Sequence, residues 1–269
     1  MTKIKLACTG LLLLAYSVTV LGDTQDCVIN PRATIEMGSH QDGVLEAVLV
    51  QRGDHVSQGQ PVARLDNKLE KMSAQLAKIR AESNIAIRSS EVQADFRAKE
   101  QQRLISLKDN SSVSESVYEQ AVIESNLAAL SVDSAKLEKR IARAEQERAE
   151  TQLARRTIYS PVNGVVVDVI MSPGEYLHEQ STLMIIAEID PLHVEVFIPV
   201  ASFGQIEEGM SAKIRPEEPI GGIYPAEVAV VDRIFDAASR TFGVRLELPN
   251  PEFELPAGVR CTVTFEQGE

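Results

Sequence analysis

The sequence predicts an α+β protein in which a long antiparallel helical hairpin is inserted in a split β-domain and a small antiparallel β-barrel follows. Three observations predict this fold. Residues 67–155 contain neither proline nor glycine, two similar β-rich segments flank that stretch, and short apolar runs at even spacing follow the second segment. A chain of 269 residues is long enough for two or three small domains with separate cores.

The first 22 residues have the pattern of a secretory signal. Lys3 and Lys5 precede an apolar run from Leu6 to Leu21, and Gly22 suits a cleavage site. This run is shorter than the ~20 apolar residues that a membrane-spanning helix needs, which favours a cleaved signal over an uncleaved N-terminal anchor. We therefore expect an exported protein.

Residues 67–155 are expected to form two long helices. Each half carries apolar and small residues at alternating spacings of three and four, which is typical of a coiled-coil seam. These are Leu69, Met72, Leu76, Ile79, Ser83 and Ala86 in the first half and Ile123, Leu127, Leu130, Ser134, Leu137, Ile141 and Ala144 in the second. The pattern fits less well around residues 90–100, which suggests a change of phase there.

A polar segment, Lys108–Ser112, separates the two helical patterns and predicts a turn. Ser112 and Glu115 have the spacing of a capping box that opens the second helix. Two helices of about 40 residues joined by a short turn form a hairpin roughly 60 Å long. The alternative is one long helix that pairs between chains, and the polar turn favours the hairpin, with its tip at about 108–114.

The two flanking segments resemble each other. Gly43–Val56 superposes on Gly164–Leu177 at a constant offset of 121 positions, and glycines recur at the same turns. A repeat of about 30 residues is too small to bury its own apolar face, so the two copies should pair. The sequence therefore predicts one β-domain assembled from residues 37–66 and 156–190.

Residues 191–269 contain short apolar runs separated by turn clusters rich in Gly, Pro and Asn. This spacing is typical of a small antiparallel barrel. The N-terminal segment 23–36 is expected to contribute a further strand to this barrel.

Composition argues against several functions. The net charge of −12 disfavours a nucleic-acid partner. The four histidines, His40, His55, His178 and His193, lack metal-ligand spacing, and no catalytic triad, P-loop or dinucleotide motif is present. Lys68, near the junction of the first repeat, precedes a helix instead of the second strand of a carrier-type turn. We expect a protein that is not an enzyme and has no cofactor or metal.

Three motifs carry a family resemblance. They are Ile158-Tyr159-Ser160-Pro161-Val162-Asn163-Gly164, Leu248-Pro249-Asn250-Pro251 and Leu255-Pro256-Ala257-Gly258. With the split domain and the hairpin, they resemble the periplasmic adaptor, or membrane fusion protein (HlyD-like), family, in the branch of the tripartite pumps of resistance–nodulation–division (RND) type. The resemblance implies that the split domain is lipoyl-like, a barrel-sandwich hybrid, and that the protein lies in the periplasm at the inner-membrane face.

The predicted tip carries the family's channel-docking motif. Arg103, Leu107 and Ser114 have the spacing Arg-x3-Leu-x6-Ser found in adaptors that dock on outer-membrane channels of the TolC type. The resemblance implies that these residues contact the channel. The alternative is structural: Leu107 packs in the seam, Ser114 caps a helix and Arg103 is a solvated charge.

The resemblance implies three partners: an inner-membrane RND transporter, a TolC-type channel, and further copies of the chain in a trimer or hexamer. The alternative within the family is an adaptor of an ABC-type exporter or a type I secretion system. The alternative of another class is a periplasmic coiled-coil scaffold without a transport role.

The family's membrane-proximal domain is expected to be absent. The family's adjacent first and last barrel strands imply a disulfide between Cys27 and Cys261, and the alternative is two free thiols.

Overall fold

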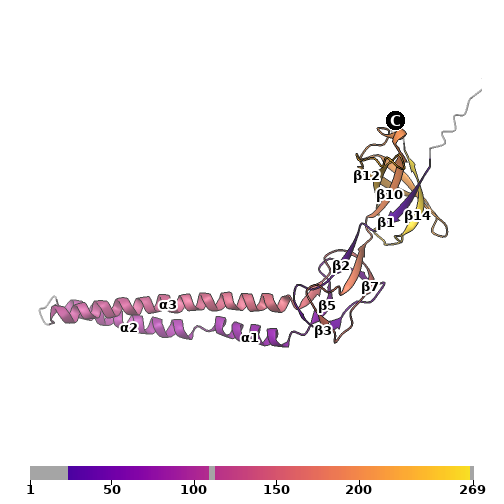
Figure 1. Cartoon of the computed structure of the whole chain (residues 1–269). Coiled ribbons are helices and arrows are strands. Elements are labelled where there is room, and N and C mark those ends of the chain that lie inside the picture. Colours follow the sequence, from indigo (N-terminus) through magenta and orange to yellow (C-terminus); the bar gives the residue numbers. More distant parts are fainter. Residues whose placement is uncertain (1–23, 109–112, 267–269) are drawn as a thin grey trace, which may run out of the picture. The chain divides into compact units, whose positions relative to one another are not determined.

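The computed structural model of the chain describes residues 24–108 and 113–266. The signal segment 1–22 and residues 109–112 of the hairpin tip lie outside the described residues. Two compact units form: residues 34–187 make one, and the described residues up to Ala33 and from Glu188 onward make the other. Figure 1 shows the elements of both units.

The second of these units is a closed six-stranded barrel with the strand order β1-β10-β13-β12-β11-β14. All neighbouring strands in it are antiparallel. The strands are β1 (Gln25–Asn30), β10 (Leu192–Pro199), β11 (Ser211–Pro216), β12 (Tyr224–Val231), β13 (Thr241–Leu248) and β14 (Val259–Phe265), with a short 3₁₀ turn at Val200–Ser202. Their alternate side chains point inward, which gives the barrel a core of aliphatic residues and Phe242.

The described part of the N-terminal segment, residues 24–36, contributes the expected strand to the barrel and also reaches a sheet of the other unit. Strand β1 closes the barrel between β10 and β14, whereas β2 (Ala33–Met37) joins a sheet of the other unit. Pro31 lies between them. Because proline has no N–H to donate, the β1 ladder ends at Asn30 and the chain leaves the barrel there.

Two four-stranded sheets with the orders β2-β9-β7-β4 and β6-β5-β3-β8 make the β-part of the other unit. Each sheet combines strands from both sequence repeats, because β3 pairs with β8 and β4 pairs with β7. The bounds are β3 (Gly43–Val48), β4 (His55–Val56), β5 (Pro61–Leu65), β6 (Thr157–Tyr159), β7 (Gly164–Val169), β8 (Tyr176–Leu177) and β9 (Met184–Glu188).

The two repeats hold each other by reciprocal hydrogen bonds. Gly53 donates its N–H to the carbonyl of Val166 at 2.8 Å, and the equivalent Gly174 donates to the carbonyl of Leu45 at the same distance. Both glycines have positive φ values, 90° and 95°, which suit glycine because other residues are strained there. Neither repeat completes these ladders alone, so the domain depends on both.

Equivalent positions of the repeats also build the core. Leu45, Val56 and Val62 are buried, and so are their counterparts at the same offset, Val166, Leu177 and Leu183. The interior of the two-sheet unit is therefore formed twice by one pattern. This shared interior explains why a segment of about 30 residues recurs on both sides of the hairpin.

The hairpin projects from one end of this two-sheet unit (Figure 1). Its first arm consists of α1 (Lys68–Glu82) and α2 (Ile85–Lys108), and its second arm is α3 (Glu115–Ala154). Arm 1 is interrupted at Ser83 and Asn84, earlier than the expected change of phase around 90–100. Ser and Asn side chains compete for backbone hydrogen bonds, which favours a break at this pair.

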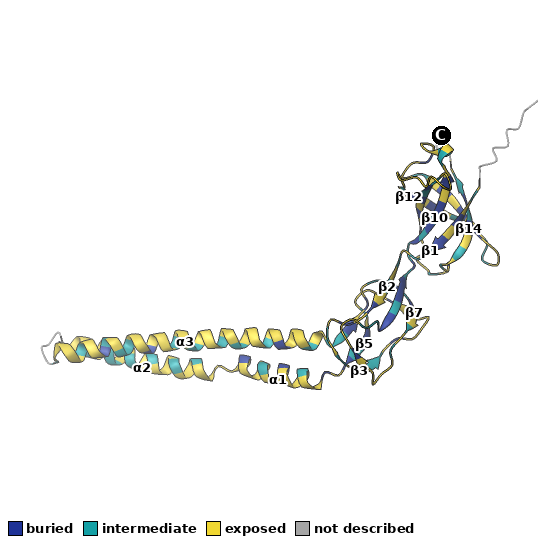
Figure 2. Cartoon of the chain, viewed as in Figure 1, coloured by how far each residue is buried: buried dark blue, intermediate teal, exposed yellow. Residues whose placement is uncertain are grey.

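The predicted seam of the hairpin is wrong. The large residues assigned to it are exposed, including Leu69 at 76% and Leu130 at 62%. The arms instead meet along small residues that are buried or half-buried: Ala74, Ala77, Ala81 and Ala94 in arm 1, and Ala121, Ser125, Ala128, Ala135, Ala142 and Ala149 in arm 2. Figure 2 shows few dark-blue residues along either arm. We call these small residues the inner seam.

Candidate functional site: the tip and base of the hairpin

The tip is the end of the hairpin farthest from the two-sheet unit (Figure 1). Arg103 and Leu107 lie one helical turn apart in α2, so both side chains are on one face of the helix. Both residues are exposed, Leu107 by 39%. Among the described residues no carboxylate lies within ion-pair distance of the Arg103 guanidinium. An exposed cation beside an exposed leucine is suited to contact a partner.

Ser114 lies across the turn from these two residues, at the N-cap of α3. Its hydroxyl makes no capping bond and lies 3.2 Å from the Ser116 hydroxyl. The expected capping box between Ser112 and Glu115 requires Glu115 to be the third residue of the helix. Glu115 is instead the first residue of α3, so the predicted position of the box is wrong. Ser112 itself is outside the described residues. Exposed Ile105 and Val117 add apolar surface near the motif, although sequence reasoning did not select them.

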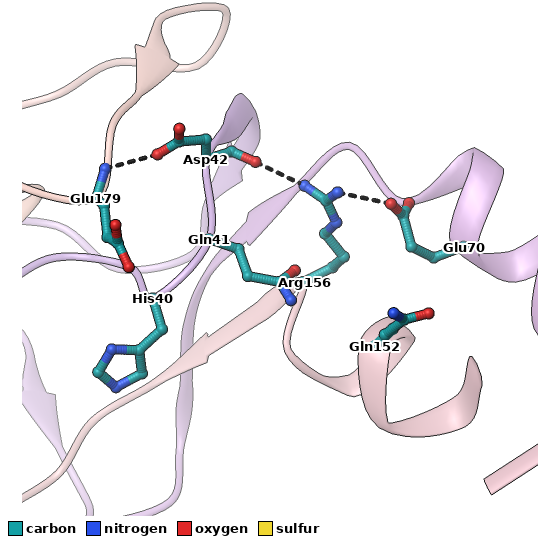
Figure 3. Close-up of a pocket in the computed structure, with 7 residues that line it drawn as sticks. All are labelled: His40, Gln41, Asp42, Glu70, Gln152, Arg156 and Glu179. Atoms are coloured by element: carbon teal, nitrogen blue, oxygen red, sulfur yellow. Dashed lines mark hydrogen bonds and ion pairs between the residues drawn. The ribbon is translucent and has the colours of Figure 1, made fainter. Parts of the chain in front are cut away.

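Arg156 fixes the base of the hairpin (Figure 3). Its Nη2 donates to the Glu70 carboxylate in the first turn of α1 at 2.6 Å, and its Nη1 donates to the Asp42 carbonyl at 2.9 Å. The Asp42 carboxylate accepts the Glu179 N–H at 2.7 Å. One guanidinium therefore joins the end of α3, the start of α1 and the loop before β3.

A pocket of about 440 Å³ surrounds this cluster and is lined by His40, Gln41, Asp42, Glu70, Gln152, Arg156 and Glu179. The side chains of Arg156 and Glu70 are only 20% and 17% exposed, so their ion pair is partly shielded from water. Sequence reasoning missed this cluster. Nothing in the pattern around Arg156 predicted a partner 86 positions away.

Asn250, from the Pro-Asn-Pro motif, is a buried structural residue of the barrel. Its Nδ2 donates to the carbonyls of Ile189 and Leu255, and its Oδ1 accepts the Leu255 N–H, all at 3.0 Å. The backbone N–H of Asn250 donates to the Asp190 carboxylate at 2.8 Å. The motif thus serves the barrel fold by joining the segment before β10 to the segment before β14.

Cys27 and Cys261 are joined by a disulfide in the structure, with their Cα atoms 4.9 Å apart. They are directly opposite each other in the β1–β14 ladder.

Within the described part of the chain, no group of three or more His, Cys, Asp or Glu residues could hold a metal ion. No helix among the described residues is long and apolar enough to cross a membrane.

Comparisons with known proteins agree with this architecture. Residues 191–269 match the family model of the CusB-like β-barrel domain. An alignment over 244 positions, which covers 86% of this chain, is 24% identical to the macrolide export protein MacA of Yersinia pestis. An alignment over 135 positions, which covers 44% of this chain, is 27% identical to a UPF0194 membrane protein of Acidithiobacillus ferridurans. The chain spans 64% and 40% of the lengths of these two relatives.

Among solved structures, the crystal structure of MacA from Actinobacillus actinomycetemcomitans superposes with a TM-score of 0.74. It covers 91% of this chain and 78% of the other, at 19% sequence identity, so it supports the fold. The closed barrel and the two-part domain that carries a helical hairpin are therefore similar to those of membrane fusion proteins, or periplasmic adaptors.

Proposed function

We propose that this chain is the adaptor of a tripartite efflux system that bridges an inner-membrane RND transporter and a TolC-type outer-membrane channel. It is exported through the signal in residues 1–22 and acts in the periplasm at the inner-membrane face. Its role is architectural and not enzymatic. Energy for export comes from the transporter.

The two-sheet unit is proposed to be a split lipoyl-like domain, a barrel-sandwich hybrid. The exchange of strands between the repeats and the shared core support this assignment. A carrier role is not part of the proposal, because Lys68 is the first residue of α1 and not the centre of a β-turn. The domain instead carries the hairpin, and Arg156 holds the hairpin base to it.

The observation that carries the proposal is the exposed Arg103–Leu107 face at the far end of a long hairpin. Helix α3 alone has 40 residues and is therefore roughly 60 Å long. A guanidinium offers several donors in a planar fork, and the neighbouring leucine offers apolar contact. With Ser114 across the turn, these groups fit a docking contact with the helices of a channel.

The transporter is proposed to be of the RND type. The match of residues 191–269 to the CusB-like barrel supports this choice, as does the Pro-Asn-Pro segment within that barrel. The alternative is an ABC-type exporter or a type I secretion system. Capture of the transporter by chemical cross-linking in cells, followed by mass spectrometry, distinguishes these partners, and recovery of an ABC protein alone would reject the RND assignment.

The docking role is tested by Arg103→Asp in cells that depend on this adaptor for efflux. The substitution removes the hydrogen-bond donors of the guanidinium and places a negative charge that would repel carboxylates of the channel. We therefore expect efflux to be lost. The adaptor level, far-UV circular dichroism and protease resistance should stay unchanged, because Arg103 is exposed.

Arg143→Asp is the matched control, because Arg143 is also an exposed helical arginine and lies far from the tip. It should leave efflux unchanged. Normal efflux in the Arg103 variant would reject the docking role. Equal loss in both variants would point to a general effect of charge. A scaffold without a transport role would leave efflux normal even in cells that lack the chain.

A further inference from the structure

A second cavity lies beside the pocket around Arg156 at the base of the hairpin. It has a volume of about 640 Å³ and forms where the last turn of α3 meets β2 and β6. We call it the apolar pocket, and the pocket around Arg156 the polar pocket. The apolar residues that line it are Ile35, Met37, Ala154, Ile158, Tyr159 and Pro161. This size and lining are typical of a site for a small organic molecule.

The floor of the apolar pocket belongs to the core of the two-sheet unit. Met37 and Ile158 are buried, and Ile35 packs against the same core. The close packing of this core therefore sets the shape of the pocket. Tyr159, by contrast, is 49% exposed, so its ring is accessible to a ligand. An aromatic ring offers apolar contact and also attracts a cation over its face.

The two pockets share His40 and Glu179 in their linings. They lie against different faces of the end of α3, because Gln152 lines the polar pocket and Ala154 lines the apolar pocket. A molecule that fills the apolar pocket therefore meets polar groups at one edge. His40 and Glu179 stand at that edge.

The charge at this edge is negative. The Asp42 carboxylate accepts the Glu179 N–H at 2.7 Å, which holds the backbone of Glu179 in place. The Glu179 carboxylate itself has no hydrogen-bond or ion-pair partner among the described residues. Arg156 and Glu70 neutralise each other, and Figure 3 shows that pair on the opposite side of the polar pocket from Glu179.

The linings of the two pockets together contain four carboxylates and two guanidinium groups. A site with an excess of negative charge raises the local concentration of cations and disfavours anions. Beside the apolar pocket, this charge favours a ligand that combines a positive group with an apolar body.

We propose that the apolar pocket binds a small amphipathic organic cation. The apolar body of the ligand lies on Met37, Ile158 and the Tyr159 ring, and its positive group is bound by the Glu179 carboxylate. Such a ligand contacts the last turn of α3 as well as β2 and β6, so it joins the hairpin base to the sheets. The site lies within one unit of the chain and does not depend on the proposed function.

Fluorescence anisotropy of rhodamine 6G, a planar organic cation, with the purified exported chain tests the proposal. We expect saturable binding. Fluorescein, a dye of similar shape that carries negative charge, should not bind at the same concentrations. Absence of saturable binding of rhodamine 6G, or equal binding of the two dyes, would overturn the proposal.

Two substitutions locate the bound dye. Glu179→Gln keeps the size of the side chain and removes its charge, so the dissociation constant should rise about tenfold, as expected for the loss of one charge-assisted contact. Ala154→Trp places a large ring in the apolar pocket and should abolish binding. Glu145→Gln and Ala129→Trp are the matched controls, because both residues are exposed in α3 and line neither pocket. Both controls should bind the dye as the wild type does.

Unchanged binding in both pocket variants would show that the dye adsorbs elsewhere on the chain and would reject the site. Hydrogen exchange gives an independent readout, since the dye should slow exchange of residues 151–156 in the wild type and not in Ala154→Trp. Protection confined to another part of the chain would also reject the pocket. These measurements use the isolated chain, so their failure is distinguishable from failure of the Arg103→Asp efflux test.

Discussion

At the scale of single residues, two side chains each hold several segments of the chain together. Asn250 and Arg156 each connect parts of the chain that lie far apart in sequence, and both are at least partly buried. Buried polar groups need partners, so removing one side chain leaves several groups unsatisfied. Arg103, by contrast, has an exposed side chain.

Asn250→Ala should destabilise the barrel by about 2–4 kcal/mol, because the carbonyls of Ile189 and Leu255 and the N–H of Leu255 lose a buried partner. Urea denaturation followed by circular dichroism measures the change. Glu252→Ala, an exposed neighbour, should have little effect. Similar stability of both variants would show that the Asn250 bonds contribute little.

The stability of the barrel should fall on mild acidification through His193. Burial lowers the pKa of this imidazole below its ordinary value of 6.5, and the nearby Arg245 guanidinium lowers it further, while Glu247 opposes the shift. Between the lowered pKa and 6.5 the unfolded chain binds the proton more readily, so stability is full above 6.5 and declines below it.

The His193 effect is measured as the urea midpoint between pH 7.5 and pH 5.5. The wild-type midpoint should fall more steeply than that of His193→Gln, which carries the remaining histidines unchanged. Identical pH profiles would contradict this assignment.

At the scale of elements, the hairpin shows that periodicity identifies a face to be buried without naming what buries it. The small residues of the inner seam and the exposed large residues on the opposite face of each helix both recur every three or four residues. Leu and Ile are more apolar than Ala, so the sequence pattern favoured the wrong face for contact between the arms. The break at Ser83 and Asn84 also shifts the phase, since the inner positions Ala81 and Ile87 lie six residues apart across it instead of seven.

The base of the hairpin should loosen in Arg156→Met. Loss of the partly buried ion pair with Glu70 should weaken the docking of the first turn of α1 by about 1–2 kcal/mol. Hydrogen exchange of residues 68–72 should therefore become faster. Arg155→Met changes an exposed neighbour and should not alter the exchange. Unchanged protection in the Arg156 variant would show that the clamp is dispensable.

At the scale of the whole molecule, each unit is built from segments separated by the other parts of the chain. The two-sheet unit needs both repeats, and the barrel needs β1 from before the hairpin as well as the strands that follow it. Cys27 and Cys261 are 234 positions apart, so their bond encloses the entire two-sheet unit and hairpin. Closing so long a loop restricts the unfolded chain strongly.

Cys27→Ser combined with Cys261→Ser should destabilise the barrel by about 2–5 kcal/mol, as is typical when a native disulfide is removed. The Tm of the exported protein measured with and without a reductant checks this, and the double variant should be insensitive to the reductant. Non-reducing peptide mapping of the exported wild type provides the direct test. Two free thiols there would reject the bond.

The sequence by itself determined the architecture of this protein, because its strongest signals are local or repeated: a stretch without helix breakers, a recurring β-segment and evenly spaced strands. It also indicated Arg103, Leu107 and Ser114, which are exposed near the predicted turn of the hairpin. Only the tertiary structure decided which face of each helix is covered, how the repeats exchange strands, and that Arg156 and Asn250 hold distant segments together. Those features depend on contacts between residues far apart in the chain, and periodicity along the chain does not contain them.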